Sequence, residues 1–136
     1  MKFINPPNWK SPKGYNNGVL CPPNASLLFI AGQVGWNENE KMEEGFLNQF
    51  RKALQNVVTV VETAGGNRSD LARLIFYVTD KKEYSNHLKE VGLHYRDVVG
   101  KHFPVMTLVE VKSLLEENAL IEIEAIAVIS NQNRES

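Results

Sequence analysis

The chain has 136 residues, which is enough for one domain with a proper hydrophobic core. Its 15 basic and 16 acidic side chains give a net charge of −1, whereas proteins that bind nucleic acids or anionic membranes normally show a clustered basic face. The single cysteine, Cys21, excludes an intrachain disulfide, and no apolar run reaches the roughly 18 residues of a membrane span. We therefore expect a cytoplasmic protein with one domain over residues 1–136 and no nucleic-acid or membrane partner.

The predicted elements begin after an N-terminal segment, 1–16, that is rich in Pro, Asn and Gly and is expected to be a loop or an extended arm. Two strands are predicted at 18–21 and 27–34, where Val, Leu, Phe and Ile are bounded by Pro and Gly. The second run is apolar on both faces, which indicates a strand that is covered on both sides.

Two helices are predicted from the spacing of apolar residues. In the first, apolar side chains recur at intervals of three and four and Gly65-Gly66 ends the pattern. Its apolar face is Phe46, Phe50, Ala53, Leu54, Val57, Val61 and Ala64. In the second, Asp80 and Glu83 have the spacing of a capping box, and Gly100 marks the end. The apolar face of this helix is Tyr84, Leu88, Val91, Tyr95, Val98 and Val99.

Three further strands are predicted at 71–79, 103–111 and 120–129, and a polar tail, 131–136, is expected to fray. Pro104 restricts the middle one of these strands to a sheet edge or a strand start. The resulting order, β-β-α-β-α-β-β, predicts an α+β domain with two helices packed on one face of a mixed sheet.

The last strand has two different faces. Alternation places Ile121, Ile123, Ala125, Ala127 and Ile129 toward the helices, and Leu120, Glu122, Glu124, Ile126 and Val128 on the other side. That second face, which would also carry Leu27 and Phe29, has no further helix to cover it. Exposed apolar patches of this extent are rare on monomers, so the pattern predicts self-association without giving the number of subunits.

Several short motifs follow one another along the chain. They are Gly14-Tyr15, Phe29-Ile30-Ala31-Gly32-Gln33, Asn56-Val57 with Ala64-Gly65, Tyr77-Val78-Thr79-Asp80, Phe103-Pro104 with Val109-Glu110-Val111, and Ile121-Glu122-Ile123-Glu124-Ala125-Ile126-Ala127-Val128. In this order and spacing, over roughly residues 14–129, the chain resembles the reactive intermediate deaminase family (Rid, also called YjgF and formerly L-PSP endoribonuclease). The resemblance implies a chorismate-mutase-like fold and a homotrimer with its sheets inward, its helices outward and a cleft at each subunit interface.

The resemblance also implies which residues would form the cleft. In the family's deaminases an arginine binds the carboxylate of a 2-imino or 2-enamino acid, and a carboxylate of the last strand holds the hydrolytic water. Matched motif by motif, Glu122 takes the place of that carboxylate and Tyr15 that of a cleft tyrosine. Gly32 and Gln33 belong to the segment whose backbone completes the cleft. The family implies no cofactor and no metal.

Met106 stands where the family's phrase F-P-A-R-[ST]-x-V-E-V has its arginine, which indicates a subgroup without the catalytic arginine. Arginine binds a carboxylate through a planar fork of donors, whereas methionine is only a soft apolar side chain. Losing such a contact costs roughly 2–5 kcal/mol, so efficient deamination of 2-aminoacrylate-type substrates is not expected. Segment 85–88 also has no clear match to the family's cleft-lining asparagine and aromatic. Thr107, the next residue, can offer its hydroxyl or backbone N–H to a ligand.

Each candidate residue has a structural alternative. Glu122 and Glu124 on a largely apolar face can act as an acid or base, or lie at a solvated interface rim and pair with Lys or Arg of another subunit. Tyr15 either lines the cleft or packs its ring. Trp36, just beyond the Gly-Gln motif, either forms the floor for a flat ligand or anchors a turn.

Three functions therefore remain open. The first is a hydrolase or deaminase-like enzyme acting on an imine or enamine, which depends on Glu122. The second is a non-catalytic small-molecule binding or regulatory trimer, in which Met106 makes the cleft more apolar. The balanced charge argues against the third, an endoribonuclease or translation inhibitor. No metal site is expected, since His87 and His94 would lie ~10 Å apart along a helix.

Overall fold

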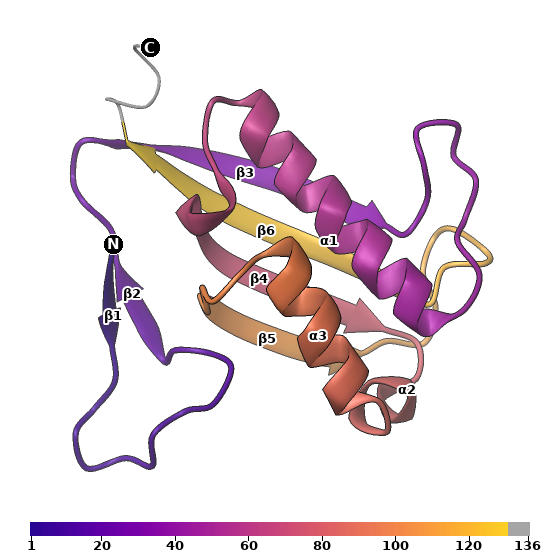
Figure 1. Cartoon of the computed structure of the whole chain (residues 1–136), viewed down its shortest axis with the longest axis horizontal. Helices are drawn as coiled ribbons and strands as arrows, with labels where there is room; N and C mark the ends of the chain where they lie inside the picture. Colours follow the sequence, from indigo (N-terminus) through magenta and orange to yellow (C-terminus); the bar gives the residue numbers. More distant parts are fainter. Residues whose placement is uncertain (131–136) are drawn as a thin grey trace.

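The computed structural model describes residues 1–130, and the predicted tail 131–136 lies outside the described residues. Its centre is a four-stranded sheet in the order β3-β6-β4-β5 (Figure 1). These strands are β3 (Ala25–Val34), β4 (Leu71–Val78), β5 (Val105–Glu110) and β6 (Ile121–Ser130). Strands β4 and β5 are parallel, whereas β6 is antiparallel to both of its neighbours. The sheet is mixed, as predicted, and β5 is an edge strand that begins directly after Pro104.

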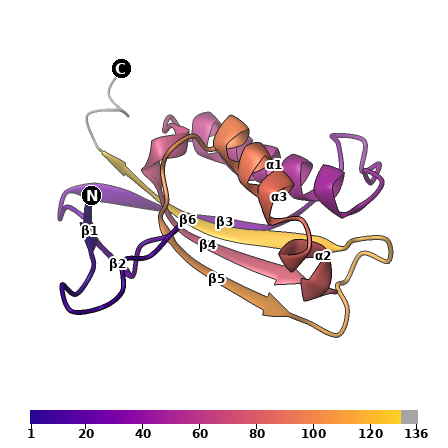
Figure 2. The same cartoon turned by 60° about the horizontal axis from the view of Figure 1, so that its bottom comes forward.

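Two helices, α1 (Phe46–Thr63) and α3 (Leu88–Val98), cover one face of this sheet (Figure 2). The predicted apolar stripe of α1 is buried there from Phe46 to Val61, whereas its last member, Ala64, follows the helix and is exposed. The ring of Phe50 stacks on that of Phe76 in β4 at 6.0 Å. Gly65, with φ 92°, ends α1 as predicted, because a residue without a side chain adopts this left-handed conformation freely.

The second predicted helix is divided into α2 (Lys81–Ser85) and α3, which corrects the expectation of one continuous element. His87 lies at the break, where its Nδ1 contacts the carbonyl oxygen of Glu83 at 2.7 Å. A continuous helix would use that carbonyl for the His87 N–H, so the side chain competes with the helix ladder. Asp80 caps α2 through the N–H of Lys82 (3.0 Å), while the Glu83 N–H donates to the backbone oxygen of Asp80 (3.1 Å) instead of its side chain.

The N-terminal segment is more ordered than the predicted loop or arm. β1 (Lys2–Ile4) pairs with β2 (Gly18–Leu20) as a two-stranded antiparallel ribbon beside the main sheet (Figure 1). The Asn5 side-chain oxygen accepts from the backbone N–H of Asn17 (2.9 Å), and the Asn5 amide donates to the side-chain oxygen of Asn16 (2.8 Å). Such short strands give no local period, so the sequence could not predict this pairing.

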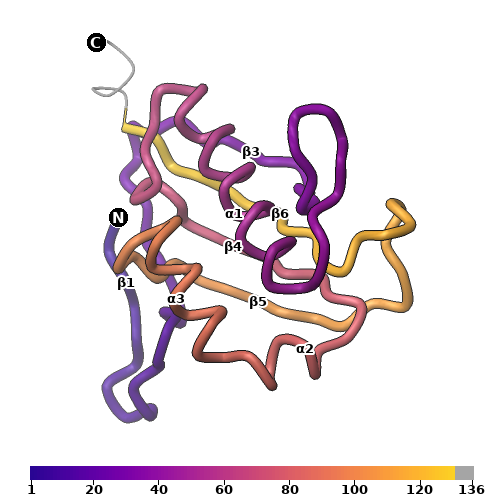
Figure 3. The backbone as a smooth tube through the Cα atoms, turned by 45° about the vertical axis from the view of Figure 1, so that its right-hand side comes forward, coloured from indigo at the N-terminus to yellow at the C-terminus, as the bar shows by residue number. Residues whose placement is uncertain are grey.

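Gln49 is the one buried polar side chain among the described residues, at 2% exposure, and it joins α1 to the loops at one end of the sheet. Its amide donates to the backbone oxygens of Glu43 and Asn118, each at 3.0 Å, and its oxygen accepts from the N–H of Leu120 at 2.7 Å. Figure 3 shows the two loops before α1 and before β6 at the same end of the sheet. The hydrogen bonds of Gln49 therefore fix both loops to α1 at this end of the sheet.

The face opposite the helices is open, as the alternation in β6 predicted (Figure 2). Leu27 and Phe29 are 59% and 72% exposed, and Ile126 is half-buried. Two residues that were expected on this face, Leu120 and Val128, are not exposed on it. Leu120 lies just before β6 and packs against the core, and Val128 is buried, so the open apolar patch is smaller than predicted.

Candidate functional site

Glu122 lies on the open face of the sheet, in the middle of three strands. It stands opposite Val34 of β3 and Tyr77 of β4 in the register of β6. A Cβ at Gly32 would lie 2.1 Å from the Glu122 Oε2 atom, so the carboxylate rests directly above the backbone of Gly32. Only glycine leaves that space free. The Gly32 and Glu122 of the sequence prediction are thus in contact, although 90 positions separate them.

A bulge in β3 makes this contact possible. The pairing between β3 and β6 shifts register between Ile30 and Gln33, and the Gln33 amide donates to the backbone oxygen of Ala31 at 3.1 Å. Bulges bend a strand and redirect its side chains. Gln33 therefore bonds to its own strand, next to the Glu122 carboxylate that Gly32 accommodates.

Glu124, Tyr77 and Arg73 share the open face with Glu122. The Tyr77 hydroxyl donates to Glu124 Oε1 at 3.0 Å, and this hydrogen bond, followed by burial, raises the pKa of Tyr77. The negative charges of Glu124 and Glu122 raise this pKa further, whereas Arg73 lowers it. In the sequence, Tyr77 stands out only as part of a motif. The alternation of β4, which buries Leu74 and Phe76 with the helices, could have placed it here.

Met106 lies on the other side of the sheet, because β5 pairs it with the helix-facing Leu74. Between β5, α3 and the N-terminal loop there is a hollow of about 460 Å³, adjoined by a second of about 250 Å³. We call the two together the helix-side cleft. Both parts are lined by Lys13, Gly14, Phe76, Tyr84 and Met106, and Tyr15 and Leu108 line the smaller part. The larger part is also lined by Phe50, Leu88, Val91, Gly92, Tyr95, Arg96 and Phe103.

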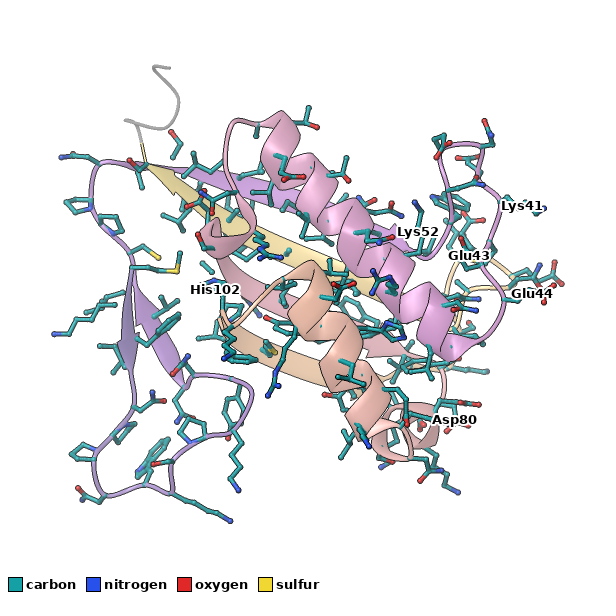
Figure 4. All side chains as sticks on the ribbon, viewed as in Figure 1. Lys41, Glu43, Glu44, Lys52, Asp80 and His102 are labelled. Carbon is teal, nitrogen blue, oxygen red and sulfur yellow. The ribbon has the colours of Figure 1, made fainter. Side chains whose placement is uncertain are left out.

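The N-terminal loop is attached to the edge of this cleft by Asn16. Its side-chain amide donates to the backbone oxygen of Phe103 (2.5 Å), and its backbone N–H donates to that of Pro104 (3.4 Å). Phe103 in turn stacks on Tyr95 at 5.6 Å, and the Tyr95 hydroxyl donates to the backbone oxygen of His102 (2.6 Å). Figure 4 shows His102 at the end of β5 nearest the β1–β2 ribbon. The loop, β5 and α3 thus form one connected wall.

Thr107 and Trp36 lie apart from the helix-side cleft. Thr107 alternates with Met106 and is exposed on the open face, opposite Ile75. Trp36 bridges to Met42 across the turn after β3, and its backbone oxygen accepts from the Asn56 amide at 2.9 Å. These contacts place Trp36 as part of a turn.

Residues 1–130 contain neither a metal-ligand cluster nor a membrane-spanning helix. No group of three or more His, Cys, Asp or Glu side chains there could hold a metal ion. No helix in the same residues is long and apolar enough to cross a membrane.

The chain is similar to proteins of one family over nearly its whole length. The family model described as Endoribonuclease L-PSP matches residues 8–129. A RutC family protein of Aquifex aeolicus is 37% identical over 130 residues, covering 94% of this chain and 99% of that protein. Escherichia coli TdcF, named a putative reactive intermediate deaminase, is 28% identical over 106 residues, or 77% of this chain and 81% of TdcF.

Solved structures agree with this sequence similarity. The crystal structure of YyfB from Yersinia pestis, a Rid family protein of unknown function, superposes with a TM-score of 0.80 at 29% identity, covering 94% of this chain and 98% of YyfB. The structural neighbours confirm the predicted YjgF/L-PSP fold. With the match of residues 8–129, they show that this chain belongs to the Endoribonuclease L-PSP family, which includes the YjgF, RutC and Rid proteins.

Proposed function

We propose that the chain forms a homotrimer and binds a small metabolite in clefts between its subunits, where Glu122 holds the water that hydrolyses an imine or enamine. The observation that carries this proposal is the position of Glu122 and Met106 on opposite faces of one sheet. One chain does not bring them together. Two copies do so if the open face of one subunit packs beside the helix-side cleft of the next.

The open face supports such an assembly. It exposes the large apolar side chains of Leu27 and Phe29 beside the half-buried Glu122 and Glu124. Burying the apolar part against another subunit is favourable by about 25 cal/mol for each Å² removed from water. The structure of TdcF with bound serine, which superposes with a TM-score of 0.69 at 26% identity, supports a small-molecule ligand.

Glu122 is better suited than Glu124 to hold a water. The Glu124 carboxylate already accepts a hydrogen bond from the Tyr77 hydroxyl. No side chain or backbone group of residues 1–130 donates a hydrogen bond to the Glu122 carboxylate. In the proposed step this carboxylate takes a proton from water as the oxygen attacks the imine carbon, and the C=N electron pair moves to nitrogen. Return of the proton to nitrogen gives a carbinolamine. Transfer of its hydroxyl proton to nitrogen then breaks the C–N bond, which releases ammonia and leaves the carbonyl product. Imine and water become carbonyl and ammonia, with no oxidant or reductant.

Met106 determines which substrates are suitable. At the position of the family's arginine it offers no donor to a carboxylate, so a 2-imino acid loses roughly 2–5 kcal/mol of binding. We therefore propose an imine or enamine that carries no carboxylate on the reacting carbon. The apolar side chain of Met106 also favours the second candidate, a regulatory trimer that binds its ligand without turnover.

Sedimentation and an imine-hydrolysis assay test the proposal. Imines made in place by an amine oxidase lack a carboxylate, and those made by an amino-acid oxidase carry one. We expect a trimer that hydrolyses the first class faster, an at least 100-fold loss with Glu122→Gln, and near-normal turnover with the matched control Glu124→Gln. A monomer contradicts the assembly. Saturable ligand binding without turnover, if Met106→Arg weakens it, would support the second candidate, the regulatory trimer.

Mixed oligomers test whether the site is shared between subunits. Glu122→Gln removes the open-face half and Met106→Glu the cleft half, so each variant alone should be inactive. Refolded together in equal amounts, they should regain about a quarter of the sites, since one interface in four pairs two intact halves. If a mixed trimer forms but recovers no activity, the site is not shared between subunits.

A further inference from the structure

We propose that the helix-side cleft accepts an organic anion with an apolar ring or chain, the ring lying among the aromatics and the anionic group at Lys13 and Arg96. This inference deepens the proposed function and rests on it only in taking the cleft as the ligand site. It names the ligand class as amphipathic carboxylates whose charge is bound by Lys13 and Arg96, since Met106 offers no donor.

The size and lining of the cleft favour an apolar body. Its larger part, about 460 Å³, is within the range of small-molecule sites. Phe50, Phe76 and Tyr95 line it and are almost fully buried, so this wall is a fixed part of the core. Tyr84, whose pKa is raised by burial, adds a neutral hydroxyl to this wall. A ring or branched chain can fill this space, whereas a two- or three-carbon acid leaves most of it empty.

The charges at the cleft favour an anion. Lys13 and Arg96 line it, and no acidic residue does. Within residues 1–130, neither of these two side chains has a hydrogen bond or an ion pair. The acid next to Arg96, Asp97, is already paired with Arg51. A carboxylate can therefore supply the partner that the protein does not.

Gly92 keeps the cleft open at a cost. It lies in the middle of α3, where glycine is about 1 kcal/mol less favourable than alanine. Its φ is not in the left-handed region, so no turn requires it. It lines the larger part of the cleft, and a Cβ placed on it would meet nothing within 4 Å. A larger residue would stabilise α3 while filling the space that we assign to the ligand.

Calorimetric titration with small probes tests the inference on the wild-type protein first. The probes are 3-phenylpropionate, 3-phenylpropylamine, which exchanges the charge, and propionate, which lacks the ring. We expect saturable binding of 3-phenylpropionate at least tenfold tighter than of the other two. Equal binding of the amine, or no binding of 3-phenylpropionate, overturns the inference.

Variants then locate the site. Lys13→Gln with Arg96→Gln should weaken 3-phenylpropionate binding by about 10- to 100-fold. The matched control, Lys10→Gln with Lys89→Gln, removes two exposed charges from the same loop and helix and should change it less than twofold. Gly92→Leu should abolish binding without lowering the melting temperature, so that unfolding cannot explain the loss. Unchanged binding in either cleft variant overturns the inference.

The result is independent of catalysis. Glu122→Gln should still bind 3-phenylpropionate, because the anion is assigned to Lys13 and Arg96 and Glu122 does not line the cleft of its own subunit. Glu122-dependent turnover in a protein that fails to bind the probe would overturn only the ligand class. Charge-dependent binding without any turnover would support the ligand class and overturn only the proposed hydrolysis.

Discussion

The two faces of the central sheet differ in what makes them stable, although the same strands build both. On the helix side, α1 and α3 bury Leu54, Ile123 and their neighbours completely, and the buried Gln49 has all its partners inside the chain. The open face instead carries exposed Phe29 and a pair of carboxylates. One face is complete within a subunit, and the proposed assembly would cover the other. Stability and assembly should therefore respond to different substitutions.

The largest effect is expected from truncation on the helix side. Leu54→Ala should lower the free energy of unfolding by about 2–5 kcal/mol, because it leaves a cavity in a close-packed core. Urea denaturation followed by circular dichroism measures this loss. Leu115→Ala, at a side chain that is 94% exposed, is the matched control and should change it by less than about 0.5 kcal/mol. Equal losses would remove the distinction between core and surface.

Gln49→Leu tests how much the hydrogen bonds of the buried Gln49 side chain contribute to the free energy of unfolding. The change keeps the volume but leaves the Leu120 N–H and the carbonyls of Glu43 and Asn118 without this partner. We expect a loss of about 1–3 kcal/mol in the same denaturation experiment. A more stable variant would show that water replaces these hydrogen bonds without cost.

A pH dependence is expected from Tyr95 on the helix side. Burial raises the pKa of Tyr95 above that of the unfolded chain, near 10. The unfolded chain therefore releases this proton first, so the stability that Tyr95 contributes is complete below about pH 10 and is lost as the pH rises toward the folded-state pKa. The stability difference between wild type and Tyr95→Phe should stay constant from pH 7 to 9. It should shrink above pH 10 by up to about 1.4 kcal/mol per pH unit. A difference that does not change with pH contradicts this linkage.

The smallest effect on subunit stability is expected at the open face. Phe29→Ser should change the free energy of unfolding of the isolated subunit by less than about 0.5 kcal/mol, because the ring is already 72% exposed. It should nevertheless dissociate the oligomer in sedimentation experiments, while Leu93→Ser on the exposed side of α3 should not. Dissociation by Leu93→Ser and not by Phe29→Ser would place the interface on the helices.

Periodicity predicted the elements whose pattern is long. The helical stripe from Phe46 to Val61, the alternation of 121–127 and the strand after Pro104 are all confirmed. The β1–β2 ribbon and the break at His87 were missed. The ribbon depends on pairing between residues 14 to 18 positions apart, and the break depends on a side chain that competes for a single carbonyl. Neither changes a period that can be read from a short window.

The candidate site divides in the same way. The family motifs identified Glu122, Gly32, Tyr15 and Met106 as candidate site residues. In the structure, Gly32 lies against Glu122, and Tyr15 and Met106 line the same part of the cleft. The sequence could not show that these two pairs lie on opposite sides of the sheet. It also could not show the cleft with Lys13 and Arg96, which come from a loop and a helix 83 positions apart.

By itself, the sequence determined the family and the mixed sheet with helices on one face, and it named the candidate side chains, because these follow from local pattern and motif order. Only the tertiary structure decided which side of the sheet each candidate occupies and how the bulge after Ile30 brings the backbone of Gly32 under a carboxylate. It also decided where Lys13 and Arg96 lie beside an aromatic wall. Those relations depend on strand order and helix placement. Strand order and helix placement are set by the packing of residues that are distant in the chain, so they cannot be predicted from local periodicity.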